Sequence, residues 1–281
     1  MDTLWLRTHS FQSVSLFQAT TIDERNAATD LFGKHSRTMA LLEFNEVTKS
    51  FGGLLAVREL SFSLNPHEIV GLIGPNGAGK TTVFNLVTGM IKPDTGKIMF
   101  NDEEITRLAP YQICRRGIAR TFQLVRTFNR LTALENVMAG RAYGSMPASH
   151  IRQARSESEQ ILELTGLSNK CLHRAASLGL VDRKRLEIAR ALATRPKLLL
   201  LDEMFAGLNT AEIDEAIDLV KRIRNSGIGL IVVEHVMKVI MGISDRVVVL
   251  AVGGKIADGA PEEVIGDEQV IKAYLGKRAL C

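Results

Sequence analysis

Cysteine, proline and aromatic residues are scarce in this chain of 281 residues, which has 3 Cys, 7 Pro and 5% aromatic residues. Cys114, Cys171 and Cys281 lie far apart and are odd in number, so they form neither a disulfide framework nor a C-x-x-C metal site. This usage favours a reducing compartment such as the cytoplasm. With 46% hydrophobic and 23% charged residues, the composition excludes a collagen-like, coiled-coil or wholly disordered chain.

Long hydrophobic runs are also missing from the sequence. Apolar stretches such as Val247–Val252 are far too short to cross a bilayer, and no apolar run followed by small residues indicates a secretory signal. We therefore expect any membrane-spanning partner to be a separate chain. The formal net charge of +4 weakly favours anionic partners such as nucleotides, and we expect no nucleic-acid partner.

The first part of the chain differs from the rest. Residues 1–38 show no sustained period of 2 or 3.6, and Met39 directly precedes the first convincing strand. We predict that residues 1–38 are a disordered N-terminal extension, or lie upstream of the true start, and that residues 39–281 fold. A packing or targeting arm is the alternative for this segment.

Apolar patterning predicts an α/β fold from Leu41 onward. The first two expected strands alternate and look antiparallel, with a turn at 50–53, whereas the continuous apolar runs nearer the C-terminus are typical of strands buried on both faces of a sheet. Helical spacing is expected over 82–90, 211–223, most of 110–195 and the last twenty residues. The expected strands are Leu41–Val47, Glu59–Leu64, Glu68–Ile73, Lys97–Phe100, Lys197–Leu201, Gly229–Val233 and a hairpin of Arg246–Ala251 with Lys255–Ala257.

A glycine-rich segment carries the strongest motif of the sequence. It matches G-x-x-x-x-G-K-[ST] and lies between an expected strand and an expected helix. Its glycines allow backbone N–H groups to surround phosphates, Lys80 adds a positive charge, and the Thr81 hydroxyl is placed to hold Mg²⁺. The motif predicts a nucleotide site formed by Gly74, Pro75, Asn76, Gly77, Ala78, Gly79, Lys80, Thr81 and Thr82.

Two carboxylates, Asp202 and Glu203, follow the buried strand Leu198–Leu201. Ligands of α/β sheets bind at the C-terminal ends of strands, where the phosphate-binding loop also lies. Asp202 can therefore hold Mg²⁺ through its water shell, and Glu203 can orient or deprotonate the attacking water. The alternative is that these two residues only end the strand with polar side chains and bind no ligand. The nearby loop motif weakens this alternative.

In this order, the motifs resemble those of the nucleotide-binding subunits of ABC transporters, from about Leu41 to the C-terminus. The resemblance implies an α/β P-loop NTPase core, with a mixed parallel sheet covered by helices on both faces. It also implies an antiparallel β subdomain, a helical subdomain at roughly 115–195 and a C-terminal helical extension at roughly 260–281.

The same resemblance implies roles for further residues. Phe51 would stack on the adenine of ATP, and Gln123 would contact Mg²⁺ and water and sense a transmembrane partner. His235 would hydrogen-bond the γ-phosphate and orient water together with Glu203, giving Glu203, His235 and Gln123 as the catalytic set. The metal set would be Thr81, Gln123 and Asp202, and Ala206–Asn209 matches the D-loop.

Three segments, Ala119–Gln123, Leu186–Arg190 and Ala206–Asn209, resemble the ATP-binding subunits of branched-chain amino-acid importers, the LivG type. Subunits for urea import and lipopolysaccharide export share parts of these three segments. The resemblance implies an ATPase that drives transport through two separate permease subunits, with an extracytoplasmic binding protein acting indirectly. It also implies a peripheral position on the cytoplasmic face of the inner membrane.

The sequence departs from the family at the signature motif, usually Leu-Ser-Gly-Gly-Gln, where it has Leu178–Asp182. Gly179 offers no hydroxyl, and Leu180 and Val181 add side chains where a close backbone approach is needed. Asp182 would place a carboxylate near phosphate unless it turns away to cap the following helix. We therefore expect this chain to form a heterodimer with a second ATP-binding subunit. The alternative is that the backbone keeps the geometry of the signature motif without the glycines, so that the motif still works.

Two other functions compete with the transport ATPase. A regulatory subunit with little turnover is suggested by the altered signature but opposed by the intact Glu203 and His235. A soluble ABC ATPase of translation or DNA repair would need a second cassette or a coiled-coil insertion, neither of which is visible. The arginines between Arg115 and Arg130 form either a solvated helical face or a docking surface for a permease.

Overall fold

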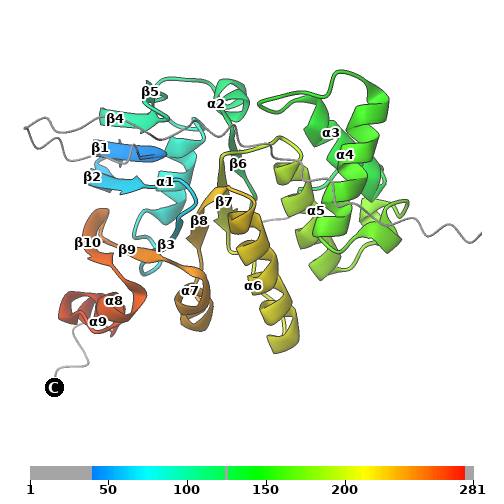
Figure 1. Cartoon of the computed structure of the whole chain (residues 1–281). Helices are drawn as coiled ribbons and strands as arrows, with labels where there is room; N and C mark the ends of the chain where they lie inside the picture. The colour runs from blue at the N-terminus through cyan, green and yellow to red at the C-terminus, as the bar shows by residue number, and fades with distance from the viewer. Residues whose placement is uncertain (1–39, 124–125, 276–281) are drawn as a thin grey trace, which may run out of the picture. The chain divides into compact units, whose positions relative to one another are not determined.

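The computed structural model of this protein describes residues 40–123 and 126–275 (Figure 1). The prediction of a disordered extension at 1–38 concerns residues outside this part. The strands are β1 (Leu42–Phe51), β2 (Leu54–Leu64), β3 (Ile69–Ile73), β4 (Thr95–Phe100), β5 (Glu103–Glu104), β6 (Ile118–Arg120), β7 (Leu198–Asp202), β8 (Gly229–Val233), β9 (Arg246–Ala251) and β10 (Gly254–Gly259). The α-helices are α1 (Lys80–Val87), α2 (Pro110–Arg116), α3 (Ala133–Ala142), α4 (Ile151–Leu164), α5 (Leu180–Leu192), α6 (Thr210–Asn225), α7 (Met237–Ile243), α8 (Pro261–Ile265) and α9 (Glu268–Leu275).

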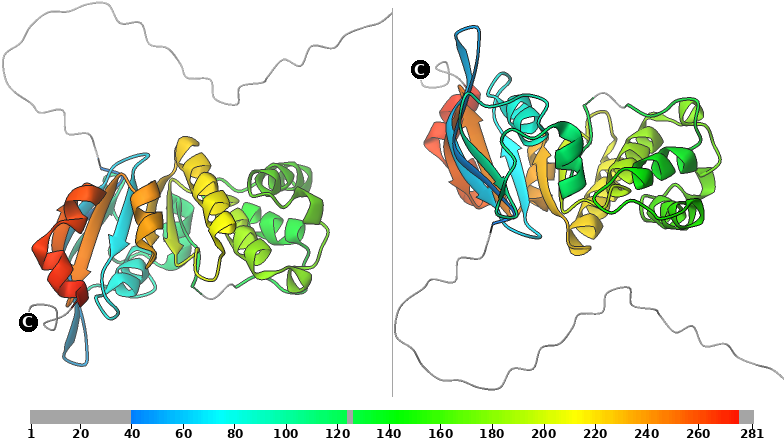
Figure 2. Two further views of the ribbon diagram at one scale, coloured as in Figure 1. Left: turned by 90° about the horizontal axis from the view of Figure 1, so that it is seen from below. Right: turned by 90° about the horizontal axis from the view of Figure 1, so that it is seen from above.

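A six-stranded sheet with the order β10-β9-β3-β8-β7-β6 forms the centre of the fold. Its strands are parallel except for β10, which pairs antiparallel with β9. Every residue of β3, β7 and β8 is buried, as expected for strands covered on both faces. Helix α1 lies on one face and helices α6 and α7 on the other (Figure 2). The predicted mixed parallel sheet with helices on both faces is confirmed.

A second, four-stranded sheet has the order β2-β1-β4-β5 and is antiparallel, as predicted. Its inner face shares one hydrophobic core with α1 and the six-stranded sheet, and Phe44 stacks on Phe62 with ring centroids 4.8 Å apart. The connecting turn is shorter than expected, because Phe51 and Leu54 already pair across it. Gly52 and Gly53 both have positive φ, 52° and 88°, which permits this two-residue hairpin.

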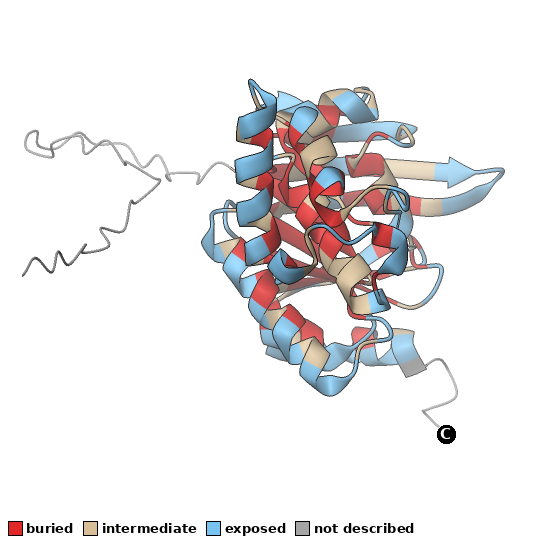
Figure 3. Ribbon diagram, turned by 90° about the vertical axis from the view of Figure 1, so that its right-hand side faces the viewer, coloured by how far each residue is buried: buried red, intermediate tan, exposed pale blue. Residues whose placement is uncertain are grey.

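Helices α3, α4 and α5 form a helical subdomain with its own hydrophobic core, which includes Val137, Leu162 and Leu186. Figure 3 views the molecule from this side and shows buried inner faces and exposed outer faces on these helices. Helix α3 begins with a capping box, in which Thr132 Oγ1 accepts from the Glu135 amide and Glu135 accepts from the Thr132 amide. The cap helps to define where the subdomain begins.

One element was missed in the region expected to be helical. Strand β6 occupies residues 118–120 and pairs in parallel with β7 at the edge of the six-stranded sheet. A strand of three residues is too short to show an alternating pattern, so only the tertiary structure reveals it. The strand matters for the predicted site because it ends three residues before Gln123. Among the described residues, no helix is long and apolar enough to span a bilayer.

Candidate nucleotide-binding and hydrolysis site

The loop of the phosphate motif joins β3 to α1, and two of its glycines are required by the fold. Gly74 has φ +150° and Gly79 has φ +106°. A Cβ atom at Gly74 would lie 2.2 Å from the Leu250 carbonyl oxygen, and one at Gly79 would lie 2.4 Å from that of Ala56. The loop therefore packs against β9 on one side and β2 on the other, with no room for side chains at these positions.

Lys80 begins helix α1 and lies across the loop. Its Nζ donates hydrogen bonds to the carbonyl oxygens of Gly74 at 2.7 Å and Pro75 at 3.1 Å. Burial lowers the pKa of the Lys80 ammonium, while the carboxylates of Glu203 and Asp202 oppose this shift. The helix N-terminus and this cation together favour an anion beside the loop. Of the other predicted loop residues, Asn76, Gly77 and Thr81 are exposed, Pro75 and Thr82 are half-buried and Ala78 is buried.

Glu203 lies between the other two residues of the predicted catalytic set. Gln123 Nε2 donates a 2.7 Å hydrogen bond to Oε2 of Glu203. His235 Nε2 lies 2.9 Å from Oε1 of Glu203, within hydrogen-bond distance. The three side chains follow β6, β7 and β8, which are adjacent strands of one sheet. Their C-terminal ends thus place the three groups together.

The backbone at Glu203 is in a conformation that non-glycine residues rarely adopt. Its φ is +48°, and its amide donates to the Val233 carbonyl oxygen at 2.9 Å. Residues held in this region cost of order 1–3 kcal/mol and are frequent at functional sites. Here the conformation turns the Glu203 side chain toward Gln123 and His235.

Asp202 is buried and pairs with Arg120, a residue that sequence reasoning did not place in the nucleotide site. Arg120 Nη2 donates to Asp202 Oδ2 at 2.7 Å, and its Nη1 donates to Asn85 Oδ1 at 2.7 Å. The guanidinium also lies 5.2 Å from the ring centroids of Phe84 and Phe122. Arg120 therefore links β6, α1 and the strand end that carries the acidic pair. The sequence signal that could have identified Arg120 as a residue of the site is its position shortly before Gln123.

Phe51 lies at the hairpin end of β1, and 47% of its surface is exposed. The Lys49 ammonium lies 5.5 Å from the centroid of its ring. The phosphate-binding loop approaches the same hairpin at Ala56, whose carbonyl oxygen would lie 2.4 Å from a Cβ at Gly79. An exposed ring at this edge is free to offer a flat apolar face to a base.

The segment that replaces the family signature forms the start of α5. Gly179 is the N-cap with φ −65°, and among the described residues no atom lies within 4 Å of a Cβ placed on it. Asp182 does not cap the helix, as one expectation had it, but accepts a 2.5 Å hydrogen bond from Lys170 Nζ. An ion pair with a cation outside the helix is the stronger contact here. Leu180 is 46% exposed, so an apolar side chain projects where the family has a glycine.

Further polar residues around Glu203 were not found from the sequence. Lys184 of α5 donates to the carbonyl oxygens of Glu203, Met204 and Ala206, and burial lowers the pKa of its ammonium. Glu234 is buried, accepts from the Phe205 amide at 2.8 Å, and has a pKa raised by burial. These residues hold the backbone that follows β7. Their partners are 19 positions or more away in the chain, beyond the reach of motif analysis.

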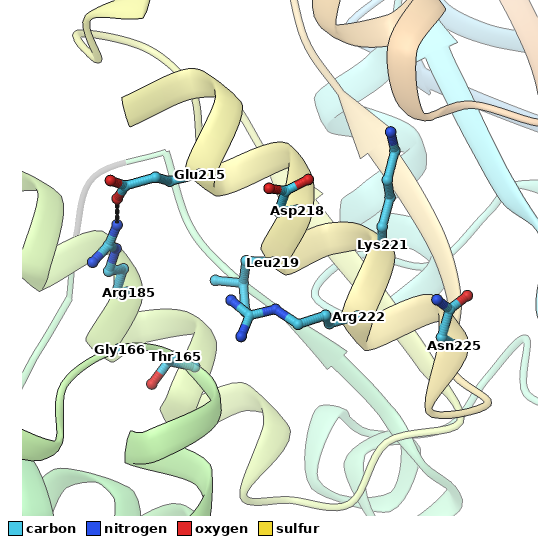
Figure 4. Close-up of a pocket in the computed structure, with 9 residues that line it drawn as sticks. All are labelled: Thr165, Gly166, Arg185, Glu215, Asp218, Leu219, Lys221, Arg222 and Asn225. Carbon is cyan, nitrogen blue, oxygen red and sulfur yellow. Dashed lines mark hydrogen bonds and ion pairs between the residues drawn. The ribbon is translucent and has the colours of Figure 1, made fainter. Parts of the chain in front are cut away.

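A cavity of about 570 Å³ lies elsewhere, between α6 and the helical subdomain (Figure 4). Its lining is largely charged, and an ion pair between Arg185 and Glu215 crosses from α5 to α6 beside it. None of its lining residues belongs to the phosphate-binding loop, and Gln123, Glu203 and His235 do not line it either. It is separate from the nucleotide site.

A phosphate-binding loop, an acidic strand end, a glutamine after β6 and a histidine after β8 define the class: a P-loop ATPase with the added helical subdomain of an ATP-binding cassette. The chain belongs to the ABC transporter family, whose pattern matches residues 57–206, and it is an ATP-binding subunit with the ATP-hydrolysing domain of that family. Residues 255–279 also match a family described as branched-chain amino acid ATP-binding cassette transporter.

Several curated proteins are similar to most of the chain. It is 43% identical over 250 residues to the high-affinity branched-chain amino acid transport ATP-binding protein LivG of Escherichia coli K12, covering 84% of this chain and 98% of that protein. It is 40% identical to BraF of Pseudomonas aeruginosa, with the same coverage. The lipopolysaccharide export ATP-binding protein LptB of Haemophilus influenzae is 36% identical over 240 residues, covering 85% and 99%.

Solved structures agree with this assignment. A nucleotide-free ATP-binding cassette from an ABC transporter aligns with a TM-score of 0.78 and 30% identity, over 85% of this chain and all (100%) of that one. The ADP conformation of an ATP-binding cassette gives the same TM-score, identity and coverage.

Proposed function

We propose that this chain is the ATP-hydrolysing subunit of an importer for branched-chain, hydrophobic amino acids. The observation that carries the cargo assignment is the 43% identity to LivG over 250 residues, together with the separate C-terminal match at 255–279. The identity to LptB is lower, 36%, which makes lipopolysaccharide export the weaker cargo assignment. The greater identity to LivG than to LptB also favours import over export as the direction of transport.

The proposed ATP site uses the phosphate-binding loop from Gly74 to Thr82 and an adenine stacked on Phe51. Lys80 would exchange the two loop carbonyl oxygens that it now contacts for phosphate oxygens, which are stronger acceptors. Backbone N–H groups of the loop and the start of α1 would surround the phosphates. The exposed position of Thr81 leaves its hydroxyl accessible from the same side.

A Mg²⁺ ion fits the residues proposed for it. The Thr81 hydroxyl, the Asp202 carboxylate and the Gln123 side-chain oxygen are oxygen donors, which this cation prefers. Arg120 occupies Oδ2 of Asp202, and the other carboxylate oxygen remains for the ion or its water. When bound, the ion would neutralise phosphate charge during transfer of the terminal phosphoryl group.

Glu203 is the proposed base that orients and deprotonates the attacking water. Both its oxygens are held by side chains, Gln123 Nε2 on one and His235 Nε2 on the other. A water that replaces one of these contacts would face the terminal phosphate with its proton directed at the carboxylate. His235 Nε2, once released from Glu203, would donate to an oxygen of the γ-phosphate and stabilise its developing charge.

A heterodimer is the proposed assembly. In a head-to-tail pair, each ATP lies between one subunit's phosphate-binding loop and the other subunit's signature motif. This chain offers a full loop side but lacks the signature hydroxyl at Gly179 and carries side chains at Leu180 and Val181. A second ATP-binding subunit with an intact signature would complete the site formed by Lys80 and Glu203.

The proposed docking surface for a permease lies between α2, α3, α5 and β6. A cavity of about 360 Å³ there has a mostly apolar lining, and the exposed rings of Phe128 and Tyr143 contribute to it. The arginines between 115 and 130 do not form one free face, because Arg116 pairs with Glu103 and Arg120 with Asp202. Two separate permease subunits would hold the chain at the cytoplasmic face of the inner membrane, and an extracytoplasmic protein would deliver the solute.

The test is a tagged pull-down of the full chain from detergent-solubilised native membranes, combined with uptake of labelled leucine. Two permeases and a second ATP-binding subunit should be recovered, and a Glu203→Gln strain should lose uptake while the protein still binds ATP. Recovery of lipopolysaccharide-export partners would replace the cargo assignment. Recovery of soluble partners alone, or normal uptake in the Glu203→Gln strain, would overturn the proposal.

A further inference from the structure

Three charged residues of α5 lie three positions apart, at Lys184, Glu187 and Arg190, and so share one face of the helix. Each of them contacts the backbone of a segment next to Gln123 or Glu203. We name these three residues the α5 stripe. Sequence analysis gave none of them a role in the reaction, although Glu187 and Arg190 lie in a segment that carries the family resemblance.

Glu187 is the central residue of the α5 stripe and is 4% exposed. Its Oε1 accepts hydrogen bonds from the amides of Phe122 and Arg126, both at 3.3 Å. These amides precede and follow Gln123, so one carboxylate oxygen binds the backbone on both sides of that residue. Burial raises the pKa of Glu187, while these two hydrogen bonds and the charges of Arg190 and Lys184 oppose the shift.

The outer residues of the stripe extend this attachment in both directions. Arg190 Nη1 donates to the Arg126 carbonyl oxygen at 2.6 Å, beside the amide that Glu187 holds. Lys184 Nζ donates to the Glu203 carbonyl oxygen at 3.3 Å and to that of Ala206 at 2.6 Å. One rigid helix therefore holds both backbone segments whose side chains meet in the Gln123–Glu203 hydrogen bond.

We infer that Glu187 is a positioning residue for ATP hydrolysis, which holds the backbone around Gln123 so that its side chain reaches Glu203. The inference rests on the roles proposed for Gln123 and Glu203. Helix α5 also begins at the altered signature segment, with Gly179 as its N-cap. A shift of α5 against a second ATP-binding subunit would therefore reach the backbone beside Gln123 through Glu187 and that of Glu203 through Lys184.

The chemistry of the contact explains why a carboxylate is suited to it. One carboxylate oxygen can accept two N–H groups, and a glutamine oxygen can do the same without the charge. A leucine fills a similar volume but leaves both amides without their acceptor. Leucine also leaves the charges of Lys184 and Arg190 without this partner, so we expect a loss of stability as well. The Glu187→Gln variant and the melting temperatures therefore separate a loss of turnover from a loss of folding.

The test measures kcat and KM for ATP in the complete transporter with the full-length chain. Glu187→Leu should lower kcat about tenfold and leave KM within about twofold, while Glu187→Gln should restore most of the turnover. In a Gln123→Ala background, Glu187→Leu should lower kcat by less than about twofold, because the group that it positions is already gone. The melting temperature of each variant is measured alongside.

Glu215→Leu is the matched control. It makes the same substitution and removes another α5 contact, the ion pair with Arg185, but touches neither segment that the α5 stripe holds (Figure 4). Its kcat should stay within about twofold of the parent protein.

Several outcomes would overturn the inference. It is wrong if Glu187→Leu changes KM instead of kcat, if Glu187→Gln fails to restore turnover, or if the loss persists in full in the Gln123→Ala background. If Gln123→Ala alone leaves kcat unchanged, the proposed role of Gln123 is wrong, and the inference falls with it. If Gln123→Ala slows turnover but Glu187→Leu does not, only the role of Glu187 is wrong.

Discussion

His235 Nε2 and Glu203 Oε1 lie 2.9 Å apart, although 32 positions separate the residues in the chain. The register of the sheet produces this contact, because Asp202 of β7 pairs with Val233 of β8. Each functional side chain follows its strand within two residues of that pair. The spacing between a carboxylate and an imidazole is thus set by backbone hydrogen bonds of two fully buried strands.

Replacing Glu203 by Gln should stop hydrolysis and preserve nucleotide binding. The amide cannot take a proton from water, and general-base catalysis is worth roughly 100-fold to 10,000-fold in rate. We therefore expect ATP turnover to fall at least about 100-fold, with the Kd for ATP within about threefold. Steady-state hydrolysis and equilibrium binding measure the two effects. Glu159→Gln, on an exposed position of α4, is the control, and a turnover above a tenth of normal in Glu203→Gln would remove Glu203 from the mechanism.

Gly79→Ala should be more disruptive than Gly77→Ala, although both glycines have positive φ. A Cβ at Gly79 meets the Ala56 carbonyl oxygen at 2.4 Å, whereas nothing in residues 40–123 and 126–275 lies within 4 Å of one at Gly77. We expect Gly77→Ala to lower the free energy of unfolding by about 1–2 kcal/mol through backbone strain alone. Gly79→Ala should cost more than that and also weaken ATP binding, because β2 and the loop must separate. Urea unfolding and ATP titration of both variants check the order, which equal losses would contradict.

The raised pKa of Glu187 predicts a pH-dependent difference in stability. Above pH 4.5, the ordinary pKa of this group, the unfolded chain releases the proton while the folded chain keeps it up to a higher pH. The folded state then binds more protons, so the free energy of unfolding falls as pH rises through this window. Glu187→Gln has no such group, and its stability relative to the parent protein should rise from pH 4.5 upward and then level off. Urea unfolding of both proteins at several pH values measures the difference, and a stability of Glu187→Gln relative to the parent that falls with rising pH would contradict the prediction.

The altered signature predicts that this chain does not pair with itself. The Glu203→Gln protein, which retains ATP, should remain monomeric in Mg-ATP by size-exclusion chromatography with light scattering. Gly179→Ser should be tolerated, since a Cβ there meets no atom in the part of the chain that the structure describes, and should change stability by only a few tenths of a kcal/mol at this N-cap. Tight dimers of the Glu203→Gln chain alone would contradict the heterodimer proposal.

Local features of the sequence predicted much of the fold and part of the site. The phosphate-binding loop is contiguous, so its glycines and Lys80 could be assigned from spacing alone. Strands such as Gly229–Val233 were found because five buried residues in a row leave a clear apolar run. The two-residue hairpin at Gly52 and Gly53 and the short strand β6 were not found, since neither carries enough residues for a period.

The contacts that organise the site could not be predicted from the sequence. Arg120 and Asp202 are 82 positions apart, and Glu187 is 65 from Phe122, so only the folded sheet and α5 bring them together. Asp182 shows how a local rule loses to tertiary structure. An acidic residue in the first turn is expected to cap or face the helix end, but a nearby Lys170 offers a full charge and takes the side chain instead.

The separate hydrophobic core of α3, α4 and α5 has a consequence for how this protein can change over evolutionary time. Helices α3 and α4 can drift in surface sequence without disturbing the strands beneath the nucleotide site. Helix α5 cannot, because its residues Ile188, Ala191 and Leu192 also pack into the core of the six-stranded sheet. Adaptation to a new membrane partner could therefore accumulate on α3 and α4 while the residues around Glu203 stay in place. These two helices, rather than all three, are the piece to exchange between related cassettes when transporter specificity is redesigned.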